Sequence, residues 1–340
     1  MDRRTFITAC GAAALTALAG CQKEQKAEET PEEAPAPEEA PVPEEAPATE
    51  INARIAALKG PTAMGLVKFM EEAPAGVSFE ILAAPDELTP KIVQGEVDVA
   101  ALPANLASVL YNKTQGGVRV IAVNTLGVIY ICEKGGTIAS VADLAGRTIY
   151  ASGKGATPEF ALAYVLEANG LTPGTDVTIE WKSEHTECVA ALEADPAGVA
   201  MLPQPFVTTA AMKDDAIRVA LDLTKEWEAA AGGASAMITG VHIARAEYAE
   251  EHADELRAII DAAAESAAFV NSNVAEAAQL IEKYDIVPAK VAEKALLACN
   301  IVCITGEEMK AKLSGYLDVL FARNPESVGG ALPADDFYFI

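Results

Sequence analysis

The chain has 340 residues and a formal net charge of -25, from 50 acidic and 25 basic side chains. So large an acidic excess, with no basic run in the sequence to offset it, argues against nucleic-acid binding and against direct adsorption on anionic lipid. The chain is long enough for two α/β lobes of ordinary domain size.

Residues 1–20 are predicted to be an export signal. Arg3 and Arg4 precede a short apolar stretch, residues 9–19, that is too short to span a bilayer. The arginine pair favours the twin-arginine route, although ordinary secretory signals also begin this way. Leu18-Ala-Gly-Cys21 is a lipobox pattern, which predicts a lipoprotein whose Cys21 receives a lipid such as palmitate. The alternative is a plain secretory signal with an incidental cysteine.

Residues 21–50 are predicted to be a disordered linker that begins with the lipidated cysteine. The segment consists mainly of Pro, Ala and Glu and has no aromatic side chain. Such a composition buries too little apolar surface to offset the entropy of ordering, and its prolines and like charges keep it extended. We therefore expect a globular part held at the outer face of the cytoplasmic membrane through its N-terminal lipid only.

The remaining residues contain a strand–loop–helix–strand pattern twice, which predicts two similar α/β lobes. The first copy has expected strands at 51–58, 77–82 and 97–102 and expected helices at 88–94 and 105–112. The second copy has expected strands at 148–152, 177–181, 199–202 and 217–222 and expected helices at 158–169 and 186–193, with a turn of helix at 141–146. In the second copy, Thr157 is the expected N-cap of its helix and Pro158 the first helical residue.

Two further β-type segments are expected to connect the lobes. An unusually long run, 118–132, leads into the second lobe, and 236–244 leads back, followed by a long helix at 246–271 and mostly helical structure beyond it. These crossings predict a first lobe of residues 51–127 and 240–340 and a second lobe of residues 128–239. Two connecting strands would form a hinge, so the lobes are expected to close on a ligand.

Two short motifs recur at the expected carboxyl ends of strands, where ligands of open α/β sheets bind. Lys59-Gly60-Pro61-Thr62 corresponds to Lys154-Gly155-Ala156-Thr157, and Leu-Pro occurs at 102–103 and again at 202–203. A helix start with a nearby lysine favours an anion. The alternative is that these threonines only cap, the glycines only turn and the lysines only face water.

The candidate ligand contacts are polar residues from these loops and from the strand ends beside them. Asn105 and Gln204 can each donate and accept hydrogen bonds, whereas a helix cap and a loop position are their structural alternatives. Glu184 and His185 follow a strand, and Glu184 would favour an amine on the ligand. The predicted set is Lys59, Gly60, Thr62, Asn105, Lys154, Gly155, Thr157, Glu184, His185 and Gln204.

The lipobox, the linker and the paired lobes together resemble the solute-binding proteins of ABC importers, in particular the branch serving sulfonates, taurine, nitrate and thiamine-precursor pyrimidines. The most recognisable segments are 101–112, 141–149, which is similar to the family's entry to the second lobe, and 201–206. The resemblance implies a two-lobed type II periplasmic-binding-protein fold that closes on one small molecule. It also implies a monomer that delivers its solute to an ABC permease and ATPase complex. The lysines at the two helix starts make the expected ligand a small organic anion or a polar heterocycle with an acidic group.

No cofactor, metal site or catalytic residue is predicted. Cys132, Cys188, Cys299 and Cys303 are expected to be unpaired packing residues, although a pairing of the last two stays open. Two alternatives to import remain. One is an enzyme like the thiamine-precursor synthases, although their cysteine cluster is missing from this sequence, and the other is a ligand sensor on the same fold.

Overall fold

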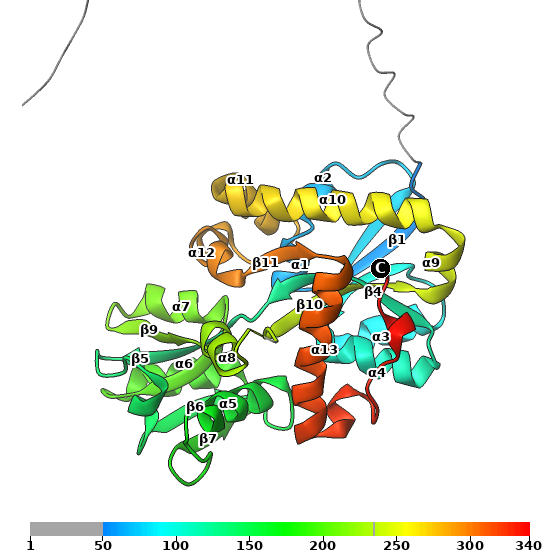
Figure 1. Cartoon of the computed structure of the whole chain (residues 1–340). Coiled ribbons are helices and arrows are strands. Elements are labelled where there is room, and N and C mark those ends of the chain that lie inside the picture. The colour runs from blue at the N-terminus through cyan, green and yellow to red at the C-terminus, as the bar shows by residue number, and fades with distance from the viewer. Residues whose placement is uncertain (1–49, 234) are drawn as a thin grey trace, which may run out of the picture. The chain divides into compact units, whose positions relative to one another are not determined.

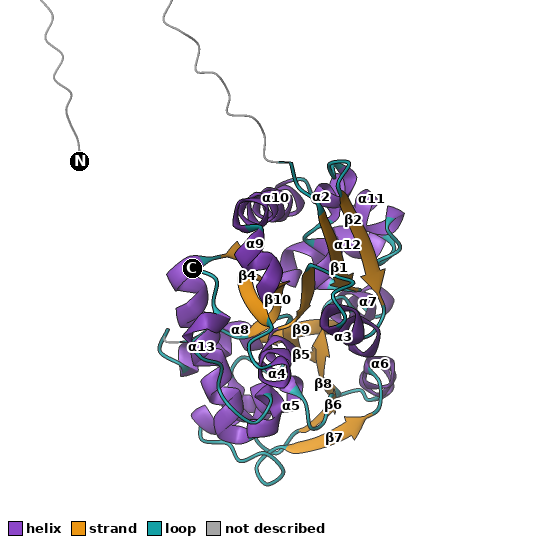
Figure 2. Ribbon diagram, turned by 90° about the vertical axis from the view of Figure 1, so that its right-hand side faces the viewer, coloured by secondary structure: helices purple, strands orange, loops and turns teal. Residues whose placement is uncertain are grey.

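The computed structural model describes residues 50–233 and 235–340. The predicted signal, the predicted lipidation site Cys21 and nearly all of the predicted linker lie outside these residues. Within them, the chain forms two β-sheets with helices packed on both faces of each (Figures 1 and 2).

The first sheet has six strands in the order β11-β4-β10-β3-β1-β2. Strand β1 is parallel to β2 and β3, whereas β10 is antiparallel to β3 and β4, and β11 is antiparallel to β4. The strands are β1 (Ala53–Leu58), β2 (Val77–Leu82), β3 (Val99–Pro103), β4 (Val118–Leu126), β10 (Ile238–Arg245) and β11 (Ile301–Ile304).

The second sheet has five strands in the order β7-β6-β8-β5-β9. Strand β6 is parallel to β7 and β8, and β5 is antiparallel to β8 and β9. The strands are β5 (Ile129–Lys134), β6 (Thr148–Ser152), β7 (Thr178–Lys182), β8 (Val199–Pro203) and β9 (Ile217–Asp222). The order matches that of β2-β1-β3-β10-β4, so the predicted duplication is confirmed. Strands β10 and β5 are the corresponding antiparallel strands of the two sheets. Each is the first strand that the chain forms after it crosses from the other sheet.

The helices follow the strands in the expected alternation. The α-helices are α1 (Pro61–Met64), α2 (Val67–Glu71), α3 (Pro85–Val93), α4 (Ala104–Thr114), α5 (Thr157–Ala168), α6 (His185–Ala194), α7 (Phe206–Lys213), α8 (Leu223–Ala230), α9 (Ala246–Glu251), α10 (Ala253–Ser272), α11 (Val274–Lys283), α12 (Ala289–Ala295) and α13 (Gly306–Arg323). Short 3₁₀ turns are η1 (Val141–Leu144), η2 (Leu296–Cys299), η3 (Pro325–Val328) and η4 (Asp335–Phe337).

Successive side chains of a central strand point to opposite faces of its sheet, and helices cover both faces. On β1, Ile55 packs with α10 and α11, whereas the neighbouring Ala56 faces the layer that contains α3 and α4. On β5, Ile131 faces α5 and α8, whereas Cys132 faces α6 and α7. Burial on both faces explains why these strands read as continuous apolar runs in the sequence.

The long apolar run at 118–132 is two strands and not one. Strand β4 ends at Leu126 in the first sheet, and β5 begins at Ile129 in the second. Gly127 at the junction has no room for a side chain, because a Cβ there would lie 2.1 Å from the Met237 methyl and 2.2 Å from the Thr224 hydroxyl oxygen. The expected passage between the lobes is therefore confirmed, and the chain changes sheet at a close-packed glycine.

Two other expectations differ from the structure. The helix expected at 246–271 is divided at His252, whose backbone angles of φ -125° and ψ 40° are not helical. Its ring stacks on Tyr248 and its Nδ1 lies 2.7 Å from the Glu255 carboxylate, so side-chain contacts hold the break. Strand β11 was not expected, because its four residues are too short to establish a period of two.

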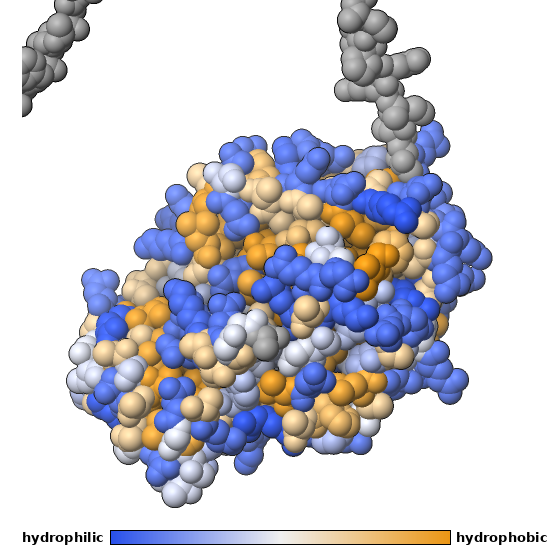
Figure 3. Space-filling view, in the orientation of Figure 1, coloured by the Kyte–Doolittle hydropathy of each residue, from blue (hydrophilic) through white to orange (hydrophobic). Residues whose placement is uncertain are grey.

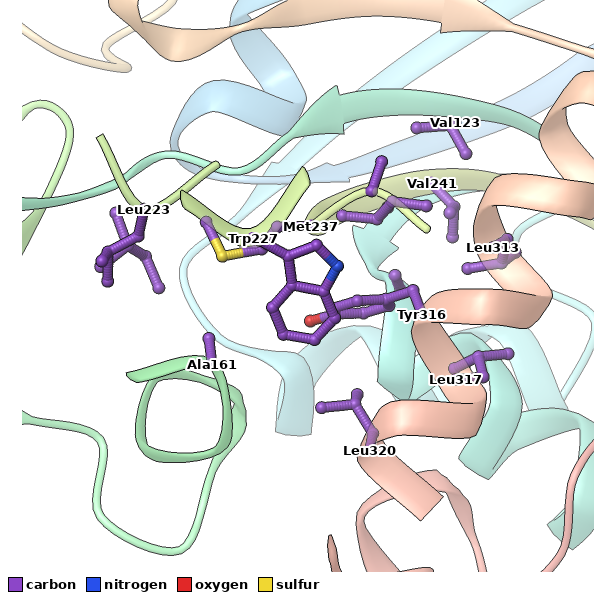
Figure 4. Close-up of a cluster of buried hydrophobic side chains, with 14 of the residues drawn as sticks. Val123, Ala161, Leu223, Trp227, Met237, Val241, Leu313, Tyr316, Leu317 and Leu320 are labelled. Carbon is purple, nitrogen blue, oxygen red and sulfur yellow. The ribbon is translucent and has the colours of Figure 1, made fainter. Parts of the chain in front are cut away.

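The hydrophobic core extends from one sheet to the other. Helix α13 packs against β4 and also against α5, and one cluster contains Val123 and Val241 of the first sheet together with Trp227 of α8 and Leu320 of α13 (Figure 4). At the surface end of this contact, Arg323 makes two hydrogen bonds to the Glu167 carboxylate, at 3.1 and 2.7 Å. The two sheets are thus joined by packed side chains as well as by chain crossings.

The acidic excess lies at the surface of the described part of the chain. Among the described acidic residues, only Asp98 and Glu133 are buried, and each is paired with arginine. Figure 3 shows hydrophilic side chains spread over the visible face, with small apolar areas between them. Across residues 50–233 and 235–340, no helix has the length and apolar character needed to cross a membrane.

The four cysteines of the described residues are all unpaired, as expected. Cys132, Cys188 and Cys299 are buried, and Cys303 is partly buried. Burial raises the pKa of Cys132 and of Cys299 to about 12, so these thiols stay protonated and act as small apolar side chains.

Candidate functional site

A cavity of about 310 Å³ lies between the two sheets, at the carboxyl ends of their parallel strands. On the side of the first sheet it is lined by Pro103, Asn105, Met237, Ile238, Thr239 and Tyr316. On the side of the second sheet it is lined by Ile129, Ser152, Thr157, His185, Met201 and Pro203. Its volume is at the small end of the range of about 300–1,000 Å³ that is usual for small-molecule sites.

The duplicated Leu-Pro motif brings equivalent positions of the two lobes to this cavity. Pro103 ends β3 opposite Gly240 of β10, and Pro203 ends β8 opposite Ile129 of β5. Both prolines line the cavity. Proline has no N–H to continue a strand ladder, so each motif ends its strand where the site begins.

Ser152 and His185 form the polar centre of the second lobe's wall. Ser152 is the last residue of β6, and its Oγ lies 2.5 Å from Nδ1 of His185, the first residue of α6. The imidazole also packs on the Phe206 ring at a centroid distance of 4.9 Å. Burial lowers the pKa of His185, and the nearby Glu184 carboxylate only partly opposes this effect. The ring is therefore neutral at pH 7 and, with Nδ1 accepting from Ser152, would present an N–H at Nε2.

Asn105 holds the corresponding polar position in the first lobe. It is the second residue of α4, and its Nδ2 donates to the Ser327 carbonyl oxygen at 3.2 Å. This bond fixes the amide plane and leaves the side-chain carbonyl oxygen as an acceptor beside the cavity.

Tyr316 carries a hydroxyl that the protein itself does not satisfy. Figure 4 shows its side chain extending from α13 beside Trp227, and the ring centroids are 5.5 Å apart. The side chain is fully buried, and its hydroxyl oxygen has no hydrogen-bond partner among the residues that the structure describes. Burial raises the pKa of Tyr316, and the neighbouring Thr157 hydroxyl, which does not meet the geometry of a hydrogen bond to the phenol, offsets this effect only in part. A protonated hydroxyl therefore remains unused in the wall of the cavity.

Thr157 reaches the cavity because it does not cap its helix. The expected N-cap role is wrong: Ala156 holds the N-cap position with no side-chain cap, and Thr157 is the first helical residue, followed by Pro158. Ala156, Thr157 and Pro158 all line the cavity.

The other residues of this second loop lie outside the lining. Lys154 and Gly155 are exposed, and the Gly155 N–H donates to the Glu159 carboxylate at 2.6 Å. The chain thus places its own carboxylate at the helix start where an anion was expected.

The first Lys-Gly loop also lies outside the lining. Lys59 is ion-paired with Asp285 at 3.1 Å, and the buried Thr62 Oγ1 donates to the Leu58 carbonyl oxygen at 2.8 Å. Gly60 precedes α1, which has only four residues. So short a helix has little dipole to offer an anion.

Glu184 and Gln204 are engaged by the protein near the site. Glu184 forms a capping box with Glu187 at the start of α6. Gln204 is buried, and its Oε1 accepts from the Thr208 hydroxyl at 2.8 Å. Of the ten predicted contacts, the structure brings three to the lining, namely Asn105, Thr157 and His185.

Sequence reasoning missed several lining residues. Ser152 lies two residues before Lys154, at the expected end of a strand, and this position was a usable signal. Met201, Met237 and Tyr316 carry no such signal, because apolar and aromatic residues in strands and helices read as core. Only the fold brings Tyr316, more than 150 positions later in the chain, opposite Thr157.

The described lining offers no charged side chain. No Lys, Arg, Asp or Glu belongs to the lining residues that the structure describes. Within the described ranges, no group of three or more His, Cys, Asp or Glu could hold a metal ion. Cys188 lies near Ser152, but burial raises the pKa of its thiol, which is the opposite of what a nucleophile needs.

A family model matches residues 64–295, well over half of the chain. The family is described as "ABC transporter, phosphonate, periplasmic substrate-binding protein". No curated protein sequence matches the chain.

Solved structures with the same fold span nearly the whole described region. An ABC transporter structure from Parabacteroides distasonis is 22% identical, with a TM-score of 0.70, and the match covers 86% of this chain and 99% of that one. The aliphatic sulphonate-binding protein SsuA of Escherichia coli is 19% identical, with a TM-score of 0.67 and coverage of 86% and 93%. A putative sulfonate-binding SsuA of Methylobacillus flagellatus is 19% identical, with a TM-score of 0.59 and coverage of 84% and 89%. At these identities the likeness establishes the two-lobed periplasmic-binding-protein fold.

Proposed function

This chain belongs to the family of periplasmic substrate-binding proteins of ABC phosphonate transporters, and we propose that it captures one small solute in the cavity between its sheets. The solute is then delivered to the membrane permease and ATPase of an ABC importer. The observation that carries the proposal is the composition of the cavity wall, to which both lobes contribute equivalent strand ends, at Pro103 and Pro203. Such a site can be closed or opened by a rotation of one lobe against the other.

The proposed lobes are residues 51–127 with 240–340, and residues 128–239, and the second boundary falls just inside β10 of the first sheet, which begins at Ile238. The chain passes between the sheets at Gly127 and again before β10, and these segments would form the hinge. Helix α13 packs against β4 of the first lobe and α5 of the second. When the lobes close, this helix contact has to be kept or has to slide. The proposed ligand contacts are Asn105, Thr157 and His185, together with Ser152 and Tyr316.

The family's location implies that the globular part works outside the cytoplasm. We extend this to a lipid anchor at Cys21, which rests on the lipobox and on the acidic linker that follows it. The protein would act as a monomer without a cofactor and without catalytic activity. The names of the relatives make phosphonates and sulfonates the first solutes to examine.

A thermal-shift screen with a blocked-cavity variant tests this function. A ligand at one hundred times its Kd should stabilise the fold by about 2.7 kcal/mol. Ala156→Trp would fill the mouth of the cavity from an exposed position whose extended backbone accepts any side chain. The matched control is Ala197→Trp, at an exposed position of the same lobe away from the cavity.

The proposal predicts that a stabilising solute loses its effect with Ala156→Trp and keeps it with Ala197→Trp. Both variants should melt like the parent protein when no solute is present. A solute that stabilises all three proteins equally would place the binding site elsewhere and contradict the proposal.

A further inference from the structure

We propose that the solute is uncharged, with an apolar body and hydrogen-bonding groups that meet Tyr316, the Ser152–His185 pair and Asn105. This inference rests on the proposed function and narrows its substrate class. It sets this cavity apart from the anionic phosphonates and sulfonates for which the family and its relatives are named.

The described lining of the cavity has no charged side chain that could pair with an ionised ligand. The described residues around the cavity include no basic side chain, whereas apolar atoms of Val128, Ile129, Met201, Met237 and Pro158 form most of the wall. Transfer of an ionised group from water into such surroundings is strongly unfavourable unless an opposite charge or several hydrogen bonds compensate it. An anion would have to be bound here without a cation.

The lysines of the two Lys-Gly loops do not reach the cavity wall, since Lys59 and Lys154 are both exposed and both lie outside the lining. Lys59 is ion-paired with Asp285, and the start of α5 has Glu159 bound to the Gly155 N–H. A carboxylate in that position repels a second anion. His185, the one imidazole in the described lining, is kept neutral by burial.

The polar groups in the cavity wall are neutral hydrogen-bonding groups. The Tyr316 hydroxyl is fully buried and without a partner among residues 50–233 and 235–340. A buried hydroxyl without a hydrogen bond costs about 1–3 kcal/mol, so a group that is left unpaired beside a cavity is explained if a ligand pairs with it. Ser152, His185 and Asn105 add further neutral donors and acceptors. This set suits amide, carbonyl or hydroxyl groups on an apolar or aromatic frame.

The test compares neutral compounds with anions of the same shape at pH 7. Suitable pairs are benzamide with benzoate and benzenesulfonamide with benzenesulfonate, within a wider set of uncharged heterocycles and of small sulfonates and phosphonates. We expect stabilisation by neutral members, and Kd values at least tenfold weaker for the matched anions. Anions that bind as tightly as their neutral partners, or more tightly, would overturn the proposal while leaving solute binding intact. No binding by any compound of either class would count against the proposed function, and with it against this inference.

A pair of tyrosine variants tests the role of the hydroxyl. Tyr316→Phe should weaken the best neutral compound roughly tenfold, the scale of one good hydrogen bond. It should not lower the melting temperature of the unliganded protein, because the variant removes an unpaired buried oxygen. The matched control is Tyr248→Phe, whose hydroxyl is partly satisfied by Glu255 away from the cavity, and which should leave affinity unchanged. Equal affinities of the parent and Tyr316→Phe would overturn the assignment of this hydroxyl to the ligand.

Discussion

The two Lys-Gly-x-Thr loops have nearly the same sequence and different surroundings. In the first, Thr62 is buried and bonded to its own strand, and the strand β10 closes over it, since a Cβ at Gly240 would lie 2.4 Å from the Thr62 methyl group. In the second, Thr157 faces the cavity between the sheets. The first loop is part of the packing of its lobe, and the second contributes Ala156 and Thr157 to the wall of the cavity.

The difference arises from the segments that each loop meets in the fold. The first loop is followed by the four-residue helix α1 and covered by β10, whereas the second opens the twelve-residue helix α5 and faces Tyr316 of α13. A repeated motif therefore predicts a repeated local shape. It does not predict that both copies touch the ligand, because that depends on parts of the chain far away in sequence.

The largest expected effect is the pH dependence of stability that arises from His242 in the first lobe. His242 lies on β10, two residues after Gly240; it is buried, and its Nδ1 is 3.3 Å from the Asn124 amide nitrogen. Burial lowers the pKa of His242 to about 4 from an ordinary value of 6.5. Because the folded protein binds this proton less readily than the unfolded chain, stability from this residue is complete above pH 6.5 and is lost as the pH falls toward 4. Between pH 6.5 and pH 4, the free energy of unfolding should fall by about 3 kcal/mol because of this residue.

Chemical denaturation of the parent and of His242→Gln across pH 4–7 measures this loss. Over that range the free energy of unfolding of the parent should fall by about 3 kcal/mol more than that of the variant. Carboxylates with lowered pKa values, such as Asp98, contribute equally to both proteins and cancel in the comparison. Identical pH slopes would mean that His242 is not held neutral by the fold. His185→Gln is the equivalent variant in the second lobe. Because His185 lines the cavity, we expect this substitution to change ligand affinity as well.

The second prediction separates the two threonines. Thr62→Val removes the bond to the Leu58 carbonyl oxygen and should lower the free energy of unfolding by about 1 kcal/mol, with ligand affinity unchanged. Thr157→Val should leave stability nearly unchanged, because Thr157 makes no helix cap, and should weaken the ligand about three- to tenfold. Denaturation and calorimetry on both variants measure the two quantities. If both variants lost affinity, the first loop would belong to the site after all.

The smallest expected effect belongs to the two lysines. Lys59 and Lys154 are both exposed, and exposed ion pairs contribute little. Lys59→Ala and Lys154→Ala should each change Kd by less than about twofold and the melting temperature by less than about 2 °C. A large loss of affinity in Lys154→Ala alone would indicate an anionic ligand and would favour the original interpretation of this loop from the sequence.

Much of the fold was predictable because local signals agreed with the tertiary structure. The strands expected at 77–82, 148–152 and 217–222 are β2, β6 and β9 with the same bounds. The division of 118–132 was not predictable, since both halves are buried strands and only packing against Met237 and Thr224 requires the glycine between them. Strand β11 was not predicted because its four residues are too few to establish an alternating pattern.

The site was less predictable than the fold. Asn105 and His185 follow strands, so their position in the chain indicated a strand-end site. Thr157 was predicted for the ligand and also as an N-cap, and its place at the first helical residue decides between the two roles. Tyr316 lies on an amphipathic helix with an aromatic side chain, a pattern typical of core, and its unpaired hydroxyl is visible only in three dimensions.

Helix α13 has a consequence for how the chain reaches its folded state. Its residues Tyr316 and Leu320 complete the core around Trp227 of the second lobe and Val241 of the first, although they stand within the last 30 residues of the chain. Neither lobe can therefore bury its full apolar surface until almost the whole polypeptide is present. Contacts between segments so distant in sequence slow folding. They also couple the lobes, so that each matures with the other and not as a separate unit in order of synthesis.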